Sequence, residues 1–172
     1  MIENLWNPGS QEIEAWKAAP LPDLITHIVQ RYHLEARVEL AHMENLAEEA
    51  VLLEGARHPS LLELREEIGR FCIGLRAHMA MEERSLFPYL LDPAHGRASG
   101  IQAGLMPPLI KLLEDGHQAE TGLFVRLRGL SAEPLPGSGN LQARFLHCFR
   151  TLEKSLQAHI FLETQVLFRR TP

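Results

Sequence analysis

Two segments of the chain repeat one pattern of metal-binding residue types. Residues 78–87 and 159–168 both read His-x3-Glu-x3-Leu-Phe, and every matched position is separated by 81 residues. Residues i and i+4 lie one above the other on a helix, so the histidine and the glutamate of each segment point the same way. We therefore predict that His78 with Glu82, and His159 with Glu163, serve a single metal centre.

Apolar neighbours indicate that both His–Glu pairs face the interior of a helical bundle. A leucine stands three residues before each histidine, as Leu75 and Leu156, and another apolar residue stands seven before it. Burying an ionised carboxylate without a partner costs on the order of several kcal/mol. Two such carboxylates in one core therefore require compensation by cations or by shifted pKa values.

Two further histidines extend the predicted site to four helices. His33 and His117 stand in comparable apolar stripes and are 84 residues apart, close to the offset of the other pairs. The chain therefore looks like two helix-hairpin halves related by a pseudo-twofold axis. The predicted ligands are His33, His78 and Glu82 from one half and His117, His159 and Glu163 from the other.

The donor types indicate which ions such a site prefers. Imidazole and carboxylate suit iron, manganese or zinc, whereas the lack of thiolates argues against copper(I) and iron–sulfur clusters. If both glutamates bridge, each of two ions receives two histidines and two carboxylate oxygens, which leaves positions for an oxo or hydroxo bridge or a small ligand. One core histidine is ordinarily a packing residue, but four in register with two acids favour a di-metal site.

Other residues near these positions are expected to have ordinary roles. Glu83 is expected on a solvated helix face. Glu114 and Glu120, one turn either side of His117, could orient it or line an access route, but ordinary helix-surface roles are favoured. Gly116 and Gly122 each destabilise a helix by about 1 kcal/mol relative to alanine, which indicates close helix approach or an opening near His117. The rings of Tyr32, Phe87 and Phe168 are expected to fill the core, and Cys72 and Cys148 are expected to be inert buried thiols. The remaining histidines are expected to have no ligand role; they are His27, His42, His58, His95 and His147.

The hydrophobic periodicity predicts an all-α protein, because helix-period stripes fill the chain and strand-like alternation is missing. Four helices are expected, over about 21–55, 59–91, 108–129 and 140–170, with linkers at 92–108 and 130–139. Their lengths are typical of an antiparallel up-down four-helix bundle. Residues 21–172 are predicted to form this one domain, and residues 1–20 a lead-in segment.

Composition excludes several classes of partner. The formal net charge of the 172-residue chain is -5, and no basic patch appears, so nucleic acid is not an expected partner. No apolar run approaches the ~18 residues of a membrane span, and the first residues lack the features of a secretory signal. The two cysteines are too few for a disulfide framework. We therefore expect a cytoplasmic protein that does not bind membranes.

Three stretches of the chain resemble the hemerythrin-like (HHE) superfamily, and more closely its regulator-of-iron-clusters branch of di-iron proteins associated with iron–sulfur cluster repair. They are residues 25–33, 78–88 and 159–168, supported by 114–117. The resemblance implies a hemerythrin-like bundle in which the six predicted ligands hold two iron ions, with manganese or zinc as alternatives. Many members of that branch carry adjacent cysteines in an N-terminal extension, which residues 1–20 do not contain.

The resemblance and the open coordination positions together suggest three functions. The preferred one is a di-iron protein that supplies or handles iron for damaged iron–sulfur proteins under oxidative or nitrosative stress. The alternatives are a protein that binds or senses O₂ or NO, and an enzyme that reduces NO or peroxide. Ferritin-like oxidase chemistry is less favoured, because that site uses Glu-x-x-His at i, i+3. The sequence leaves enzymatic turnover and the oligomeric state open.

Overall fold

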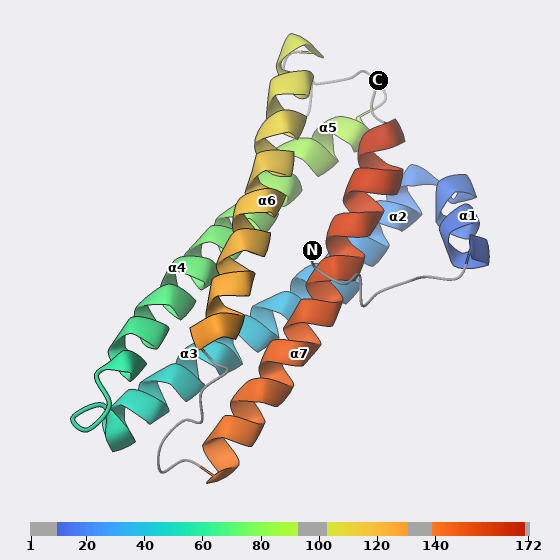
Figure 1. Ribbon diagram of the computed structural model, residues 1–172. Helices are drawn as coiled ribbons and strands as arrows, with labels where there is room; N and C mark the ends of the chain where they lie inside the picture. Colours follow the sequence, from blue (N-terminus) through green and yellow to red (C-terminus); the bar gives the residue numbers. More distant parts are fainter. Residues whose placement is uncertain (1–9, 93–102, 131–138, 171–172) are drawn as a thin grey trace.

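Four long helical rods run antiparallel to one another in the computed structural model (Figure 1), which describes residues 10–92, 103–130 and 139–170. No strand occurs in these ranges. The predicted all-α, up-down four-helix bundle is therefore confirmed. The rods comprise, in chain order, α2 (Leu21–His27), η1 (Ile28–His33) and α3 (Leu34–Glu54); α4 (Ser60–Met81), η2 (Glu82–Leu86) and α5 (Phe87–Leu91); η3 (Ala103–Leu105) and α6 (Met106–Leu130); and α7 (Gly139–Leu162), η4 (Glu163–Leu167) and η5 (Phe168–Arg170).

The predicted helix limits agree with the observed ones to within a few residues, because the apolar stripes and the proline and glycine positions are local signals. The two predicted linkers fall mostly on residues 93–102 and 131–138, which lie outside the described residues. The lead-in segment contributes α1 (Ser10–Ala18), which contacts η4 beside the bundle. Arg170 Nη1 donates a hydrogen bond of 2.8 Å to the carbonyl oxygen of Ala19 at the end of this segment.

The apolar core is divided into two clusters. One cluster joins α3, α4 and the facing parts of α6 and α7, and includes Leu40, Phe71 and Leu152. The other lies around α2, α5 and the C-terminal end of the fourth rod, and includes Leu24 and Leu167. Between the two clusters the chain buries a layer of histidine and glutamate side chains. No described helix combines the length and apolar composition that crossing a bilayer requires.

Three of the rods contain a π-helical turn, which the helix-period pattern of the sequence does not predict. The backbone N–H groups of Leu34, Phe87 and Phe168 each donate to the carbonyl five residues earlier. Two of these turns begin at Glu82 and Glu163, and the third ends at His33. A π-turn inserts one extra residue into a helix and is frequent at functional sites. The turns therefore mark the same layer as the predicted ligands.

Candidate metal centre

All six predicted ligands meet in the buried layer between the two apolar clusters. Their relative exposures are between 0% and 6%. They form two groups, and the donor atoms within each group lie within 4.8 Å of one another. Both groups contain Glu82 and Glu163, so the two positions share both carboxylates. The groups are His33, Glu82, His159 and Glu163, and His78, Glu82, His117 and Glu163.

The carboxylate of Glu82 lies between the two positions. Its Oε1 is 3.1 Å from Nε2 of His78, and its Oε2 is 3.4 Å from Nε2 of His33 and 3.9 Å from Nε2 of His159. The backbone N–H of Glu82 still donates to the carbonyl of His78, so the His-x3-Glu spacing keeps its α-helical geometry and the wider turn follows it. One oxygen of Glu82 therefore faces each ion position.

Glu163 occupies the pseudo-symmetric place opposite Glu82. Its Oε1 is 2.6 Å from Nε2 of His159 and 3.7 Å from Nε2 of His33, whereas its Oε2 is 3.1 Å from Nε2 of His117. Each position is thus surrounded by two imidazole nitrogens and one oxygen from each glutamate. This is the bridging arrangement that the sequence pattern allowed.

Two features of this layer, a close approach of two nitrogens and a carboxylate oxygen without a hydrogen-bond partner, fit bound cations. The Nε2 atoms of His33 and His159 approach each other to 3.0 Å, so in a metal-free chain one proton lies between two nitrogens that can each bind a metal ion. The fully buried Oε2 of Glu82 has no hydrogen-bond partner among the described residues. Buried charges of this kind are ordinarily paired or coordinate metals. The donor set therefore suits a pair of metal ions.

The buried carboxylates change the protonation of the histidines in the metal-free chain. Burial alone would lower the pKa of His33, but the carboxylates of Glu163 and Glu82, 3.7 and 3.4 Å from its Nε2, raise it to about 10. Burial lowers the pKa of His78, but its hydrogen bond with Glu82 and the charges of Glu82, Glu120 and Glu163 together raise it to about 9. Burial opposes the ionisation of Glu163, yet the charge of His159 and bonds to three histidines hold its pKa well below the ordinary value.

These pKa values give opposite pH dependences for fold stability and for metal binding. The folded pKa values of His33 and His78 exceed the ordinary value of 6.5, so their contribution to the metal-free fold is complete below about pH 6.5. It is lost as the pH rises through 9 to 10, and ion affinity rises over the same range because metal displaces these protons. We expect the melting temperature of chelator-treated protein to fall between pH 7 and 9. A melting temperature that rises over this range would contradict the assignment.

A carboxylate outside the six ligands contacts His33. Nδ1 of His33 donates a hydrogen bond of 2.6 Å to Oε1 of Glu83, and Nη2 of Arg37 binds the two oxygens of Glu83 at 2.7 and 2.8 Å. Burial opposes ionisation of Glu83, but the hydrogen bonds with His33 and Arg37 lower its pKa. The expectation of a solvated Glu83 was wrong, because its side chain reaches across to the neighbouring rod.

Glu120 contacts the second rod in a similar way. Its side chain is buried, with Oε1 3.4 Å from Nδ1 of His78 and Oε2 without a hydrogen-bond partner in the described ranges. Burial raises the pKa of Glu120 to about 7. The predicted surface position for Glu120 was therefore wrong. The sequence did contain a signal, since a residue three positions after His117 lies on the same face of its helix.

The other two histidines are covered by aromatic rings. Tyr32 lies parallel to the ring of His159, with centroids 6.1 Å apart, and Phe168 lies parallel to the ring of His117 at 6.0 Å. Nδ1 of His159 and Nδ1 of His117 have no hydrogen-bond partner in the described part of the chain. The rings were predicted to fill the core, and their burial confirms this. His33, which has a carboxylate partner, also stacks on Phe87 with centroids 5.7 Å apart, so His159 and His117 differ from His33 and His78 in having no carboxylate at Nδ1.

A family model for the hemerythrin HHE cation-binding domain matches residues 24–171. The chain belongs to this family. The resemblance seen in the sequence is therefore confirmed, and the match spans all six predicted ligands. For this HHE domain a buried metal-binding site of histidines and glutamates follows from the family and from the geometry of the layer.

Similar curated proteins carry the name iron-sulfur cluster repair protein. ScdA of Staphylococcus haemolyticus (strain JCSC1435) is 29% identical over 151 residues, which cover 87% of this chain and 66% of ScdA. DnrN of Neisseria gonorrhoeae is 26% identical over 92% of this chain and 96% of its own length. YtfE of Yersinia pseudotuberculosis serotype IB (strain PB1/+) is 28% identical over 91% of this chain and 68% of its own length. The matched part of this chain thus spans just under two thirds of the length of ScdA.

The HHE domain brings α4 and α6 close together at Gly116. A Cβ atom on Gly116 would lie 2.7 Å from Nδ1 of His78, whereas a Cβ on Gly122 would meet nothing within 4 Å. Close helix approach therefore holds at Gly116 but not at Gly122. The His78 ring occupies the space that a side chain at Gly116 would fill.

Substitution of Gly116 by alanine is expected to displace His78. Because changes to groups that orient a ligand typically lower metal affinity 10- to 100-fold, we expect a loss of about tenfold, measured by competition with a chelator. Gly122→Ala in the same helix is the control, and it should leave affinity unchanged and stabilise the fold by about 1 kcal/mol. Wild-type affinity in Gly116→Ala would refute the role assigned to this glycine.

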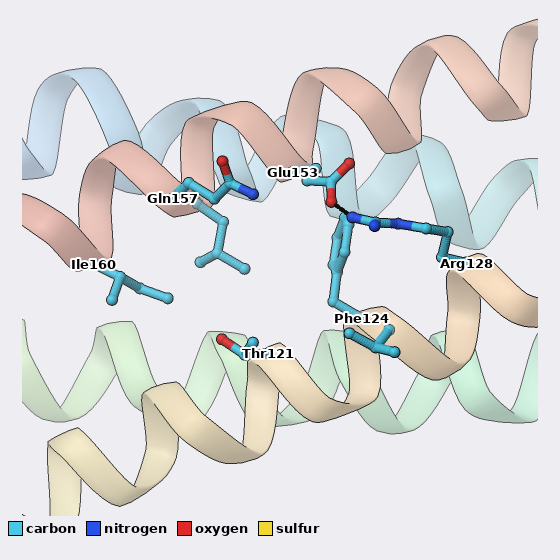
Figure 2. A pocket seen from close by; sticks show the side chains of 8 residues that line it. Thr121, Phe124, Arg128, Glu153, Gln157 and Ile160 are labelled. Carbon is cyan, nitrogen blue, oxygen red and sulfur yellow. Dashed lines mark ion pairs between the residues drawn. The ribbon is translucent and has the colours of Figure 1, made fainter. Parts of the chain in front are cut away.

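A narrow apolar groove separates α6 from α7 in this HHE domain (Figure 2). It encloses about 50 Å³ and is lined on one side by Thr121 and Phe124 and on the other by Gln157 and Ile160. Figure 2 shows the ion pair of Arg128 with Glu153 towards one end. Thr121 and Ile160 stand one helical turn from His117 and Glu163 respectively, so the groove begins beside the metal centre.

Proposed function

We propose that this chain holds two iron ions between its four rods and supplies iron to damaged iron–sulfur proteins under oxidative or nitrosative stress. The observation that carries the proposal is the pair of four-donor groups that share Glu82 and Glu163 in a buried layer. The names of ScdA, DnrN and YtfE support the link to cluster repair. We further propose that the chain acts in the cytoplasm, with damaged iron–sulfur proteins as its partners.

The residues of the layer can both bind and release such ions. Glu82 and Glu163 each direct one oxygen at either position, and four neutral imidazoles complete the donor set. Bound iron would supply open coordination positions and would itself be the cargo. When an ion leaves, the raised pKa values of His33 and His78 allow both rings to take up protons, which compensate the carboxylates left behind. Protonation of the two histidines therefore balances the charge of the buried glutamates when an ion is released.

An iron-transfer assay tests the proposal. Iron-loaded protein is mixed under anaerobic conditions with a hydratase whose iron–sulfur cluster has been damaged by peroxide, together with a thiol reductant and sulfide. We expect enzyme activity to return faster than with the same amount of free ferrous iron. The Glu163→Ala variant, mixed with equal iron, should behave like free iron. Recovery no faster than the free-iron control would exclude iron donation.

A second candidate function is reversible binding of O₂ or NO at the iron pair. The apolar groove that begins one turn from His117 and Glu163 favours it, because apolar cavities take up small apolar molecules. Rapid mixing of the reduced, iron-loaded protein with either gas tests this candidate. A stable, reversible change in the absorption spectrum supports gas binding, whereas rapid loss of iron from the protein excludes it.

A further inference from the structure

The two ion positions match in their inner donors but differ in the carboxylates behind them. At each position one histidine contacts a carboxylate through Nδ1, namely His33 with Glu83 and His78 with Glu120. The other histidine at each position is covered by an aromatic ring. Each carboxylate lies against Nδ1 of one histidine, and these two histidines belong to different donor groups, so a difference between the carboxylates is a difference between the two ion positions.

The carboxylate of Glu83 is held by two residues, His33 and Arg37. Its Oε1 accepts a hydrogen bond of 2.6 Å from His33, and both of its oxygens accept bonds of 2.7 and 2.8 Å from Nη2 of Arg37. Its side chain is 28% exposed, so without Arg37 it has a path into water. Charge-assisted hydrogen bonds of this length are the strong ones in proteins. Arg37 therefore keeps Glu83 on His33.

Glu120 has no comparable anchor. Its Oε1 is 3.4 Å from Nδ1 of His78, which is longer than the contact of Glu83 with His33 by 0.8 Å. Its Oε2 has no hydrogen-bond partner, and no lysine or arginine in the described part of the chain forms an ion pair with it. The carboxylate behind His78 is thus held less firmly, and its charge is balanced by no fixed cation.

We propose that Arg37 and Glu83 form a latch on His33 that retains the ion between His33 and His159, so that the ion between His78 and His117 is the one that the chain gives up. A carboxylate hydrogen-bonded to the far nitrogen of a ligating imidazole fixes its orientation and raises its basicity, and loss of such a partner typically weakens metal binding 10- to 100-fold. The inference rests on the proposed function, because it identifies which of two iron ions is the cargo. Arg37 and Glu83 are positioning residues, since they act through His33.

The chain contains a matched pair that lacks the contact with a ligand. Arg76 of α4 binds Glu44 of α3 through two hydrogen bonds of 2.7 and 2.6 Å, and the exposure of its side chain equals that of Arg37 at 39%. Both pairs join the first two rods. Arg76→Gln therefore removes the same kind of partly exposed ion pair as Arg37→Gln but leaves His33 untouched.

The experiment follows ferrous iron leaving the protein. Protein loaded anaerobically with two Fe²⁺ is mixed with a colorimetric ferrous chelator, and the absorbance is recorded over time. We expect two phases of equal amplitude in the wild-type protein and in Arg76→Gln. In Arg37→Gln the slow phase should quicken about tenfold towards the fast one, while Glu120→Gln should quicken only the fast phase. One rate for both ions in the wild-type protein, or equal effects of Arg37→Gln and Arg76→Gln, would overturn the latch.

Failure of the latch and failure of the proposed function give different results. Two bound Fe²⁺ that leave at one rate reject the latch and leave iron donation intact. A chain that binds fewer than two Fe²⁺ under these conditions rejects the di-iron centre itself. Because the readouts are stoichiometry and release rate, neither depends on the repair assay.

Discussion

Replacement of Glu163 by alanine is expected to abolish binding of both metal ions. Glu163 directs one oxygen at each position, so its loss removes a ligand from both groups at once. His78→Ala removes a ligand from one group only and should retain about one ion per chain, because the group around His33 keeps all four donors. Metal analysis of protein purified without added metal, with iron as the expected element, measures both outcomes.

Glu153→Ala is the control for the loss of a buried glutamate from the same rod. Glu153 is 7% exposed and pairs with Arg128 at the groove, away from the donor groups. This variant should keep about two ions per chain, and circular dichroism should confirm that all three variants remain helical. Two ions in Glu163→Ala, or near-stoichiometric zinc in the wild-type protein, would contradict the di-iron centre.

Removal of the metal is expected to lower the melting temperature by about 8–16 °C. An ion at a free concentration about 1,000 times its dissociation constant stabilises the folded state by about 4 kcal/mol, and each kcal/mol shifts the melting temperature of a domain of this size by about 2–4 °C. The ligands come from all four rods, so they assemble only in the folded chain. Thermal melts with and without a chelator at pH 7 measure the effect.

The same melts contain their own control. Glu163→Ala should show no shift when ferrous iron is added, because both donor groups are incomplete in this variant. The metal-free wild-type protein should still melt cooperatively, since the two apolar clusters do not depend on the ions. Equal melting temperatures for loaded and chelator-treated wild-type protein would mean that the ions do not bind within the core.

Local periodicity was sufficient to predict the helices and the six residues that meet between them. The spacing of His78 from Glu82 and of His159 from Glu163 is a property of one helical turn, and the apolar residues one turn away show which face is buried. His33 and His117 could be added because each lies in an apolar stripe of its own segment. These predictions needed no knowledge of which helix packs against which.

The groups that support the ligands could not be predicted in this way, because they act between helices. Glu83 reaches His33 and Arg37 on another rod, and a π-turn begins at the residue before Glu83. Gly116 matters only because His78 of α4 lies against it. The sequence by itself determined which side chains face the core, since that depends on neighbours within a turn. Only the tertiary structure decided which oxygen faces which ion position and which histidine has an anchored carboxylate, because those contacts join residues that are distant along the chain.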